Sequence, residues 1–561
     1  MKRLTLLLIV ITAAFAFAQN YNLPLQHIIV VVQENRTIDN LFPNDPTLVG
    51  VHFAATGLCG SQTITLAPYQ LDACFDASHA HTAWVTAFDG GKLDEFCKIS
   101  SGISNCNAQQ KQGVPTCTVS GKATPCPQYT TVNASQIGTY FQIAANGGFA
   151  NYMFQTNQGP SFPAHQFLFS GTSEPIAPTT PYYRHFAAEN ATFPAGDTDK
   201  HYGCLADVGT YVKEVGYLNG NEVKGYIPTY VASADRTAGY PCYEHNTLGD
   251  VLSAAGISWR YYSPGQNPPN DGSLWDAPNA IDHICVPSGS TTNGSSTCTG
   301  SIYASTVVND LQLFTDLGSN PGQVQCTLPQ VSWVIPDGNW SDHPGTVGHD
   351  GGPSWVAAIV NAVGGFNNDG TPTPGNCGYW ANTAIFTTWD DWGGFYDDIN
   401  SISAMSTGNG GKGGYPGTNN GTYYVYGFRV PLLVTSTYAV PNYVSGANIY
   451  PPVCPNSYCH DFGSILNFIE YAFGTGGNPL PEIGYPGSNW HYADYYAQDT
   501  GKAPNNYALY DFFNFKVANP FTQITGAKYA TSCFLSPANA KGCFPGYPRP
   551  PDSDAEQDDI D

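Results

Sequence analysis

The chain has 561 residues and a formal net charge of −23, because 43 acidic side chains outnumber 20 Lys and Arg side chains. This charge argues against a nucleic-acid partner, since few cations are available to neutralise phosphates, and against nonspecific adhesion to anionic membranes. Charged residues make up only 11% of a sequence that contains 60 Gly, 43 Pro and 36 Tyr, which predicts a loop-rich extracellular surface. Length alone allows two to four domains.

The first 18 residues have the pattern of a secretory signal peptide. Lys2 and Arg3 precede an apolar run that reaches Phe17, and the small-x-small sequence Ala-Phe-Ala ends at Ala18. No later stretch approaches the roughly 20 apolar residues that a membrane span requires. We therefore expect no transmembrane segment and a mature protein that is secreted or periplasmic.

The 16 cysteines are predicted to form disulfides. Their number is even, and an exported chain meets oxidising conditions. The alternative, a zinc site, needs closely spaced C-x2-C pairs, which the sequence lacks: Cys454 and Cys459 are separated by four residues. Four further cysteines are spread through polar sequence with Gly and Pro, at Cys97, Cys106, Cys117 and Cys126.

Strand-like and helix-like patterns follow one another along the chain. Short apolar or β-branched runs, several without the alternation of a half-exposed strand, predict strands at residues 27–33, 257–263, 330–336, 383–389 and 430–436. Start and stop signals or apolar i, i+3, i+4 spacing predict helices at residues 246–256, 353–365 and 461–474. Repeated strand-then-helix order predicts an α/β fold with a mainly parallel sheet.

Long segments between these elements show no regular pattern. They are predicted to be loop insertions, some pinned by disulfides, at residues 97–135, 175–245, 264–305 and 406–422. We expect them to decorate a single domain over residues 19–548. The acidic residues 549–561 are predicted to form a disordered tail.

Oxygen-bearing side chains stand at the ends of two predicted strands. Glu34 and Asn35 end the first, and Asp390 and Asp391 end the fourth, just before glycines that permit a tight turn. Such residues commonly cap helices or form turns. Two pairs at like positions instead favour a ligand site, because open α/β sheets bind ligands at the carboxyl ends of their strands. Three carboxylates and an amide suit a divalent metal ion, whose identity stays open.

Several motifs together resemble one protein family. "VVVQENRTIDNLFP" at residues 30–43 is similar to the E-N-R-[ST]-[FIM]-D signature of a phosphoesterase family that contains bacterial non-toxin-type phospholipases C and acid phosphatases. Further segments follow in the expected order, at residues 76–96, 159–173, 248–262, 332–344, 389–398 and 426–436. The resemblance implies an alkaline-phosphatase-like sheet flanked by helices and a hydrolase that acts on phosphoric ester bonds.

The resemblance also implies roles for individual residues. It places the metal on Glu34, Asn35, Asp390 and Asp391, and the nucleophile on Ser161 in the G-P-[ST]-x-P segment. The residues themselves support Ser161 modestly. A Gly-Pro turn can hold its hydroxyl at a helix start, where backbone N–H groups favour an anion, although a lone serine there is commonly only a helix cap.

Histidines are expected to complete the site. His79 and His343 match family positions that contact phosphate or protonate the leaving group, and His283 matches more loosely. Imidazole suits both tasks because it titrates near neutral pH, although isolated histidines are commonly structural. The chain departs from the family at residues 397–398, where Asp-Asp replaces a common Asp-His, and at His165, where phospholipases often have arginine.

The sequence leaves the substrate open. A phosphodiester such as a phospholipid and a phosphomonoester both fit the predicted chemistry. The alternative from another class is a secreted carbohydrate-binding or adhesive protein without turnover, which the many Tyr and Trp residues would suit. A glycosidase that uses Asp390 and Asp391 is disfavoured, because adjacent side chains on a strand point apart instead of flanking a bond.

Overall fold

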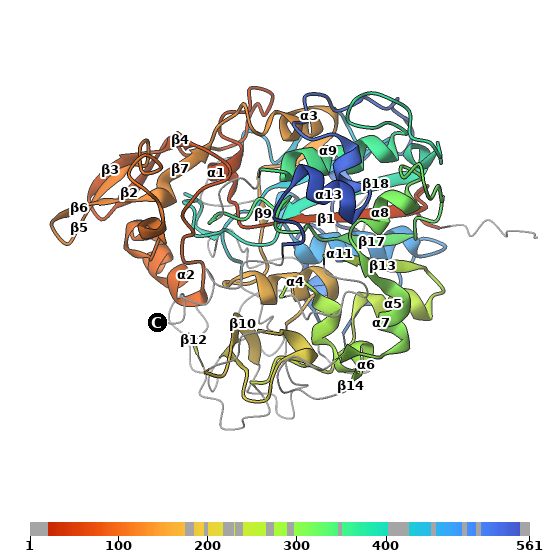
Figure 1. The fold of residues 1–561 in the computed structure, drawn as a ribbon, viewed down its shortest axis with the longest axis horizontal. Coiled ribbons are helices and arrows are strands. Elements are labelled where there is room, and N and C mark those ends of the chain that lie inside the picture. Colours follow the sequence, from red (N-terminus) through yellow and green to blue (C-terminus); the bar gives the residue numbers. More distant parts are fainter. Residues whose placement is uncertain are drawn as a thin grey trace, which may run out of the picture.

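A computed structural model shows the fold of the chain (Figure 1). The predicted signal peptide, the Gly-rich segment 406–422 and nearly all of the predicted acidic tail lie outside the residues that the structure describes. The structure describes residues 21–173, 185–195, 200–216, 229–230, 239–264, 274–288, 297–345, 350–401, 426–449, 456–484, 491–500 and 507–549.

A mostly parallel sheet forms the centre of the molecule. Its strands lie in the order β16 (Val307–Asn309), β13 (Trp259–Ser263), β17 (Val331–Val334), β1 (His27–Gln33), β18 (Thr383–Trp389), β19 (Leu432–Ser436), β8 (Gly148–Ala150) and β20 (Tyr443–Ser445). The strands from β16 to β18 are parallel to their neighbours, and β19 runs antiparallel to both β18 and β8. The predicted α/β class with a mainly parallel sheet is confirmed.

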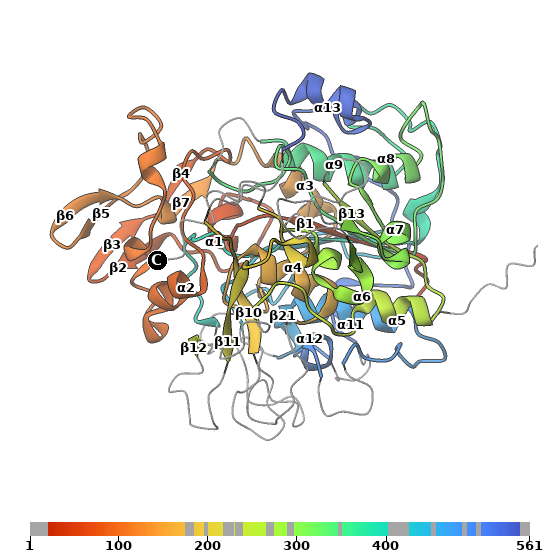
Figure 2. The same cartoon turned by 60° about the horizontal axis from the view of Figure 1, so that its bottom comes forward.

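Helices cover both faces of this sheet. Figures 1 and 2 show α3 (Gly138–Asn146) and α9 (Gly352–Val363) on one face, and α4 (Ser161–Ser170) and α11 (Phe462–Phe473) on the other. The double cover explains why β1 and β18 lack alternation, since nearly every side chain in both strands is buried. It also places the largest hydrophobic core on both sides of the sheet.

The predicted elements are found with small shifts of their ends. β1 and β18 have exactly the predicted bounds, whereas β13, β17 and β19 are shorter than predicted. The predicted helices correspond to α5 (Leu248–Ala254), α9 and α11. The reversed direction of β19 was not predicted, because an apolar run indicates burial on both faces but not strand direction.

The predicted insertions contain more regular structure than expected. β5 (Thr116–Val119) pairs with β6 (Lys122–Pro125), and β7 (Thr130–Val132) pairs with β4 (Ala67–Tyr69). The second insertion holds β10 (His185–Thr192), β11 (Tyr211–Gly216) and β12 (Thr229–Tyr230), and the third holds α6 (Asp282–Cys285), β14 (Pro287–Ser288), β15 (Thr297–Cys298) and α7 (Ser301–Thr306). Apart from β10, these strands are short, and polar residues interrupt all of them, so they leave no clear hydrophobic period in the sequence.

The remaining elements are short and join the larger ones. They are α1 (Ile38–Leu41), β2 (Thr56–Cys59), β3 (Gln62–Thr65), α2 (His81–Phe88), β9 (Met153–Phe154), α8 (Gln312–Asp316), β21 (His460–Asp461), α12 (Ala493–Tyr496) and α13 (Pro537–Cys543). Strands β2 to β7 form a lobe beside the main sheet, drawn in red and orange at the left of both views. Among the described helices, none combines the length and apolar character needed to cross a bilayer.

The predicted disulfides are confirmed. They join Cys59–Cys97, Cys74–Cys106, Cys117–Cys126, Cys204–Cys242, Cys285–Cys298, Cys326–Cys377 and Cys533–Cys543. Cys459 is also disulfide-bonded. The first three bridges lie in and around the lobe of β2 to β7, so the cysteines there stabilise an insertion and bind no zinc.

Candidate active site

The two oxygen-bearing pairs meet at the ends of adjacent strands. β1 and β18 are parallel neighbours, and their last residues lie opposite each other in the register. Glu34 and Asp390 therefore leave the sheet at the same level, as the sequence predicted. Main-chain N–H groups join the two loops through hydrogen bonds of 2.9 Å, from Asp390 to the Gln33 carbonyl, from Asn35 to Oδ1 of Asp390, and from Arg36 to the Asp391 carbonyl.

The backbone around these pairs is unusually compact. Asn35 has a φ of 61°, a left-handed conformation that asparagine tolerates better than most residues. Gly393 has a φ of 57°, and a Cβ at this position would overlap the carbonyl oxygen of Asn35. A Cβ on Gly394 would lie 2.6 Å from that of Ala77. Glycine is required here because the loop after β18 presses directly against the loop after β1.

The predicted metal ligands are fully buried, and Asn35 and Asp390 each have an oxygen without a hydrogen bond from the described residues. Glu34, Asn35, Asp390 and Asp391 all have 0% exposure. Oδ1 of Asn35 and Oδ2 of Asp390 accept no hydrogen bond from the described residues. Buried polar atoms are nearly always hydrogen-bonded, and buried carboxylates need a compensating cation. The unsatisfied oxygens and the excess negative charge thus fit a bound metal ion.

Ser161 lies against this acidic group. It is the first residue of α4, directly after Pro160, and its hydroxyl donates a hydrogen bond of 3.1 Å to Oδ2 of Asp391. The next backbone N–H, that of Phe162, donates to Oδ1 of Asn190 at 3.0 Å, which fixes the start of the helix. The structure therefore brings the predicted nucleophile into contact with the predicted metal ligands.

His165 also belongs to the group, although the sequence indicated it only as a departure from the family pattern. Its Nε2 lies 3.1 Å from Oε1 of Glu34 and 3.8 Å from Oδ2 of Asp390. It follows Ser161 by four residues on α4, so both side chains lie on the same face of the helix. That spacing was the signal in the sequence, and it is informative only once residues 161–170 are known to be helical.

His79 orients the amide of Asn35. The carbonyl oxygen of Ala77 accepts a hydrogen bond of 2.8 Å from Nδ1 of His79, so Nε2 is left to accept from Nδ2 of Asn35 at 3.0 Å. This contact turns Oδ1 of Asn35 away from the imidazole. Nε2 of His79 also lies 4.0 Å from Oδ2 of Asp391.

His343 lies beside His79, whereas His283 does not join the group. The ring centroids of His343 and His79 are 6.2 Å apart, and Nδ1 of His343 donates to the carbonyl of Pro344. The ring of His283 instead makes hydrogen bonds of 2.9 Å and 3.0 Å to Glu244 and Asp250. The hydrogen bond to Asp250 is the main reason that the pKa of His283 is raised.

Asp397 and Asp398 have a different role from the predicted metal ligands Asp390 and Asp391. Oδ1 of Asp397 accepts hydrogen bonds of 2.9 Å and 2.7 Å from the fully buried guanidinium of Arg429, which also pairs with Asp39. Oδ2 of Asp398 lies 2.7 Å from Nε2 of His52. This carboxylate cluster already holds a cation in Arg429, so it is a structural ion-pair network.

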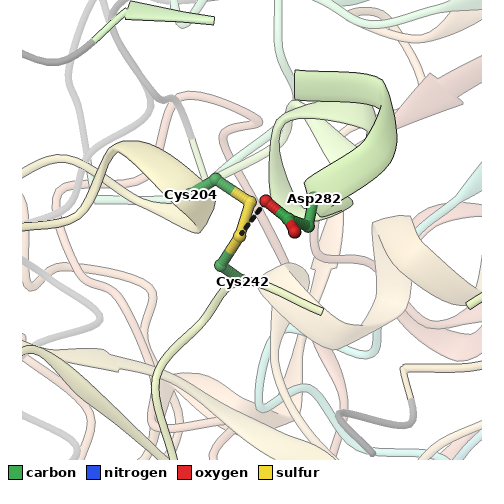
Figure 3. Close-up of side chains that lie close together, drawn as sticks. All are labelled: Cys204, Cys242 and Asp282. Carbon is green, nitrogen blue, oxygen red and sulfur yellow. Dashed lines mark hydrogen bonds between the residues drawn. A yellow bond between two sulfur atoms is a disulfide. The ribbon is translucent and has the colours of Figure 1, made fainter. Parts of the chain in front are cut away.

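A second apparent ligand group is explained by a disulfide. Cys204, Cys242 and Asp282 lie close together, but the two sulfur atoms are bonded to each other (Figure 3). The carboxylate of Asp282 approaches Sγ of Cys242 at 3.9 Å. Oxidised sulfur does not act as a thiolate ligand, so this group is not a metal site.

Comparisons with known proteins identify the family to which the chain is similar. The profile described as "Phosphoesterase family" matches residues 25–476. The non-hemolytic phospholipase C of Burkholderia pseudomallei is 30% identical over 158 residues, which are 26% of this chain and 19% of that protein. The non-hemolytic enzyme of Pseudomonas aeruginosa is 25% identical over 163 residues, 27% of this chain and 20% of the relative. The aligned part thus spans about a fifth of these curated relatives.

Proposed function

This chain belongs to the Phosphoesterase family, as its motifs predicted, and we propose that it is a secreted, metal-dependent hydrolase of phosphoric esters with Ser161 as its nucleophile. The observation that carries the proposal is the hydrogen bond from Ser161 to Asp391. It brings a hydroxyl against a buried group of carboxylates, in which Oδ2 of Asp390 accepts no hydrogen bond from the described residues. The predicted signal peptide and the disulfides support export.

The metal site would be formed by Glu34, Asn35, Asp390 and Asp391. When bound there, a divalent cation neutralises charge on the phosphoryl oxygens and lowers the pKa of a neighbouring hydroxyl. Each strand end supplies two of these side chains, and the main-chain hydrogen bonds between the loops hold the strand ends in place. His79 keeps the amide oxygen of Asn35 directed away from its own ring.

The proposed reaction has two displacements. Oγ of Ser161 gives its proton to Oδ2 of Asp391, which already accepts its hydrogen bond, and forms a bond to phosphorus while the bond from phosphorus to the substrate alcohol breaks. His343 donates a proton to the departing alcohol oxygen. A donor role for His79 stays a prediction, since its Nε2 accepts a hydrogen bond from Asn35. Water then attacks phosphorus, which breaks the bond to Ser161 and releases the phosphate product. A catalytic role for His283 stays a prediction. In the structure its ring is hydrogen-bonded to Glu244 and Asp250.

Both substrate classes remain consistent with this chemistry. With a phosphodiester such as phosphatidylcholine, the products would be diacylglycerol and phosphocholine, and the names of the aligned relatives support this class. With a phosphomonoester, the products would be an alcohol and inorganic phosphate. The same nucleophile and metal ligands would serve both substrates. The two classes differ in whether phosphorus keeps a second ester group after the alcohol departs.

A paired assay tests the proposal. The full mature chain is incubated with para-nitrophenyl phosphate and, separately, para-nitrophenyl phosphorylcholine, each before and after treatment with a chelator. We expect turnover of at least one substrate, loss of turnover on chelation, and recovery when a divalent metal is returned. Absence of turnover on both substrates with metal present would contradict the proposal and favour a binding protein.

A further inference from the structure

We propose that Nε2 of His165 is a direct ligand of the metal ion and gives the site a preference for transition-metal ions over Mg²⁺ and Ca²⁺. This inference rests on the proposed metal-dependent function. It adds a nitrogen donor to the oxygen ligands from the two strand ends, and it commits the site to a chemical class of metal.

The position of His165 on α4 supports direct ligation. Side chains four residues apart on a helix project from the same face, about one turn apart. Ser161 uses this face to reach Asp391, and His165 uses it to reach Glu34 and Asp390. One helix therefore supplies both the nucleophile and an imidazole to the group formed by β1 and β18.

The distances fit donors that share one cation. Metal–donor bonds of about 2.1 Å at right angles place neighbouring donors about 3 Å apart. Nε2 of His165 is 3.1 Å from Oε1 of Glu34, as for adjacent ligands, and 3.8 Å from Oδ2 of Asp390, as for a wider angle. These three side chains are a group whose donor atoms all lie within 4.8 Å of one another.

Charge and burial favour a ligand over a simple ion pair. The side chains of His165, Glu34 and Asp390 are all 0% exposed, and Asp391 adds a third buried carboxylate. A single imidazolium offsets one of the three negative charges, whereas a divalent cation beside a neutral imidazole offsets two. An imidazolium on Glu34 also leaves Oδ1 of Asn35 without a hydrogen bond from the residues that the structure describes, and a metal ion would satisfy that oxygen.

The nitrogen donor has a consequence for metal choice. Cages of carboxylate and amide oxygens alone suit Mg²⁺ and Ca²⁺, whereas imidazole favours later transition metals. A site with one imidazole among oxygen donors is suited to ions such as Fe²⁺, Co²⁺ or Zn²⁺. Replacement of His165 by an oxygen donor should then weaken this preference without abolishing metal binding.

Pulsed electron paramagnetic resonance tests the proposal without measuring activity. The mature chain is stripped with a chelator and reloaded with Mn²⁺, and the spectrum is searched for the hyperfine coupling of a directly bound imidazole nitrogen. We expect this coupling in the native protein and its loss in His165→Gln. We also expect the ratio of Zn²⁺ to Mg²⁺ affinity, measured by calorimetry, to fall at least about tenfold in this variant.

His343→Gln is the matched control. The ring centroids of His343 and His165 both lie 6.2 Å from that of Trp275, and Nδ1 of His343 donates to the carbonyl of Pro344. This variant should keep the nitrogen coupling. His165→Asn serves as a second substitution, and circular dichroism verifies the fold of each variant.

The outcomes separate this inference from the proposed function. Mn²⁺ binding without nitrogen coupling in the native protein, or coupling that persists in folded His165→Gln, would overturn the inference and leave the metal-dependent function intact. Failure of the native protein to bind any divalent metal would overturn both, and His165 would then be an ion-pair partner of Glu34.

Discussion

The backbone N–H of Asn35 donates a hydrogen bond to Oδ1 of Asp390, and this contact joins the two strand ends that carry the proposed metal ligands. One carboxylate thus has two tasks, because its second oxygen, Oδ2, has no hydrogen bond from the described residues. The two tasks can be separated by mutation, since an amide oxygen can still accept the bond from Asn35 but carries no charge.

Asp390→Asn should preserve the loop and impair the metal site. We expect loss of bound metal and a decrease in kcat/KM of about a thousandfold or more, because a metal ion contributes several kcal/mol to charge stabilisation. Metal content and ester hydrolysis are measured together. Asp398→Asn is the control, since Asp398 pairs with His52 and Arg429. Normal metal content and turnover in Asp390→Asn would refute the ligand assignment.

Ser161→Ala should remove the attacking oxygen while the metal ligands stay in place. We expect kcat to fall by roughly ten thousandfold or more, as when a nucleophile is removed from other hydrolases. Mass spectrometry of acid-quenched protein should detect phosphate on the peptide that contains Ser161 in the native chain only. Phosphate on a different hydroxyl would transfer the nucleophilic role to that residue.

Gly393→Ala should damage the site through the backbone. The added Cβ would overlap the Asn35 carbonyl oxygen, and the alanine would have to adopt a φ of 57°. Gly90→Ala has a similar φ of 63° but open space around its Cβ, so it should show only the conformational cost of about 1 kcal/mol. We expect Gly393→Ala to be clearly less stable in urea unfolding and to bind metal weakly. Equal stability of the two variants would show that the loops can separate.

Asp461→Asn should change how stability depends on pH. Burial, with a contribution from Asp499, raises the pKa of Asp461 to about 7. The unfolded chain ionises this group near pH 4, so the native state binds the extra proton between these values and loses stability as pH rises through them. Asparagine keeps the helix cap on Ser464 but cannot ionise. We expect the Tm of the variant to exceed that of the native chain at pH 8 and to equal it near pH 4.

Asp250→Asn should change the pH dependence of stability in the opposite direction. Burial alone would raise the pKa of Asp250, but hydrogen bonds from His283 and Thr247 make the net shift downward. This carboxylate therefore stabilises the fold above its unfolded pKa, and the contribution is lost as pH falls. We expect the variant to have a lower Tm than the native chain at pH 7 and a smaller difference at pH 3. Parallel pH profiles for the two variants would contradict both assignments.

The sequence predicted the strand ends well because two independent signals coincide there. A run of apolar or β-branched residues marks β1 and β18, and polar residues mark the abrupt end of each strand. The role of His165 was not predicted because it depends on the start of α4 and on which strand end that helix faces. The engagement of His283 by Glu244 and Asp250 is likewise a tertiary contact, which residue type and motif position do not specify.

The direct attachment of the site to the sheet limits which changes in chain length the protein tolerates. Glu34 and Asp390 follow β1 and β18 without a spacer, and the register pairs the last residues of these strands. Deletion of one residue within either strand would turn the following carboxylate to the opposite face of the sheet, since side chains alternate. We therefore expect changes of chain length to be tolerated better in the segments between the motifs than within β1 or β18.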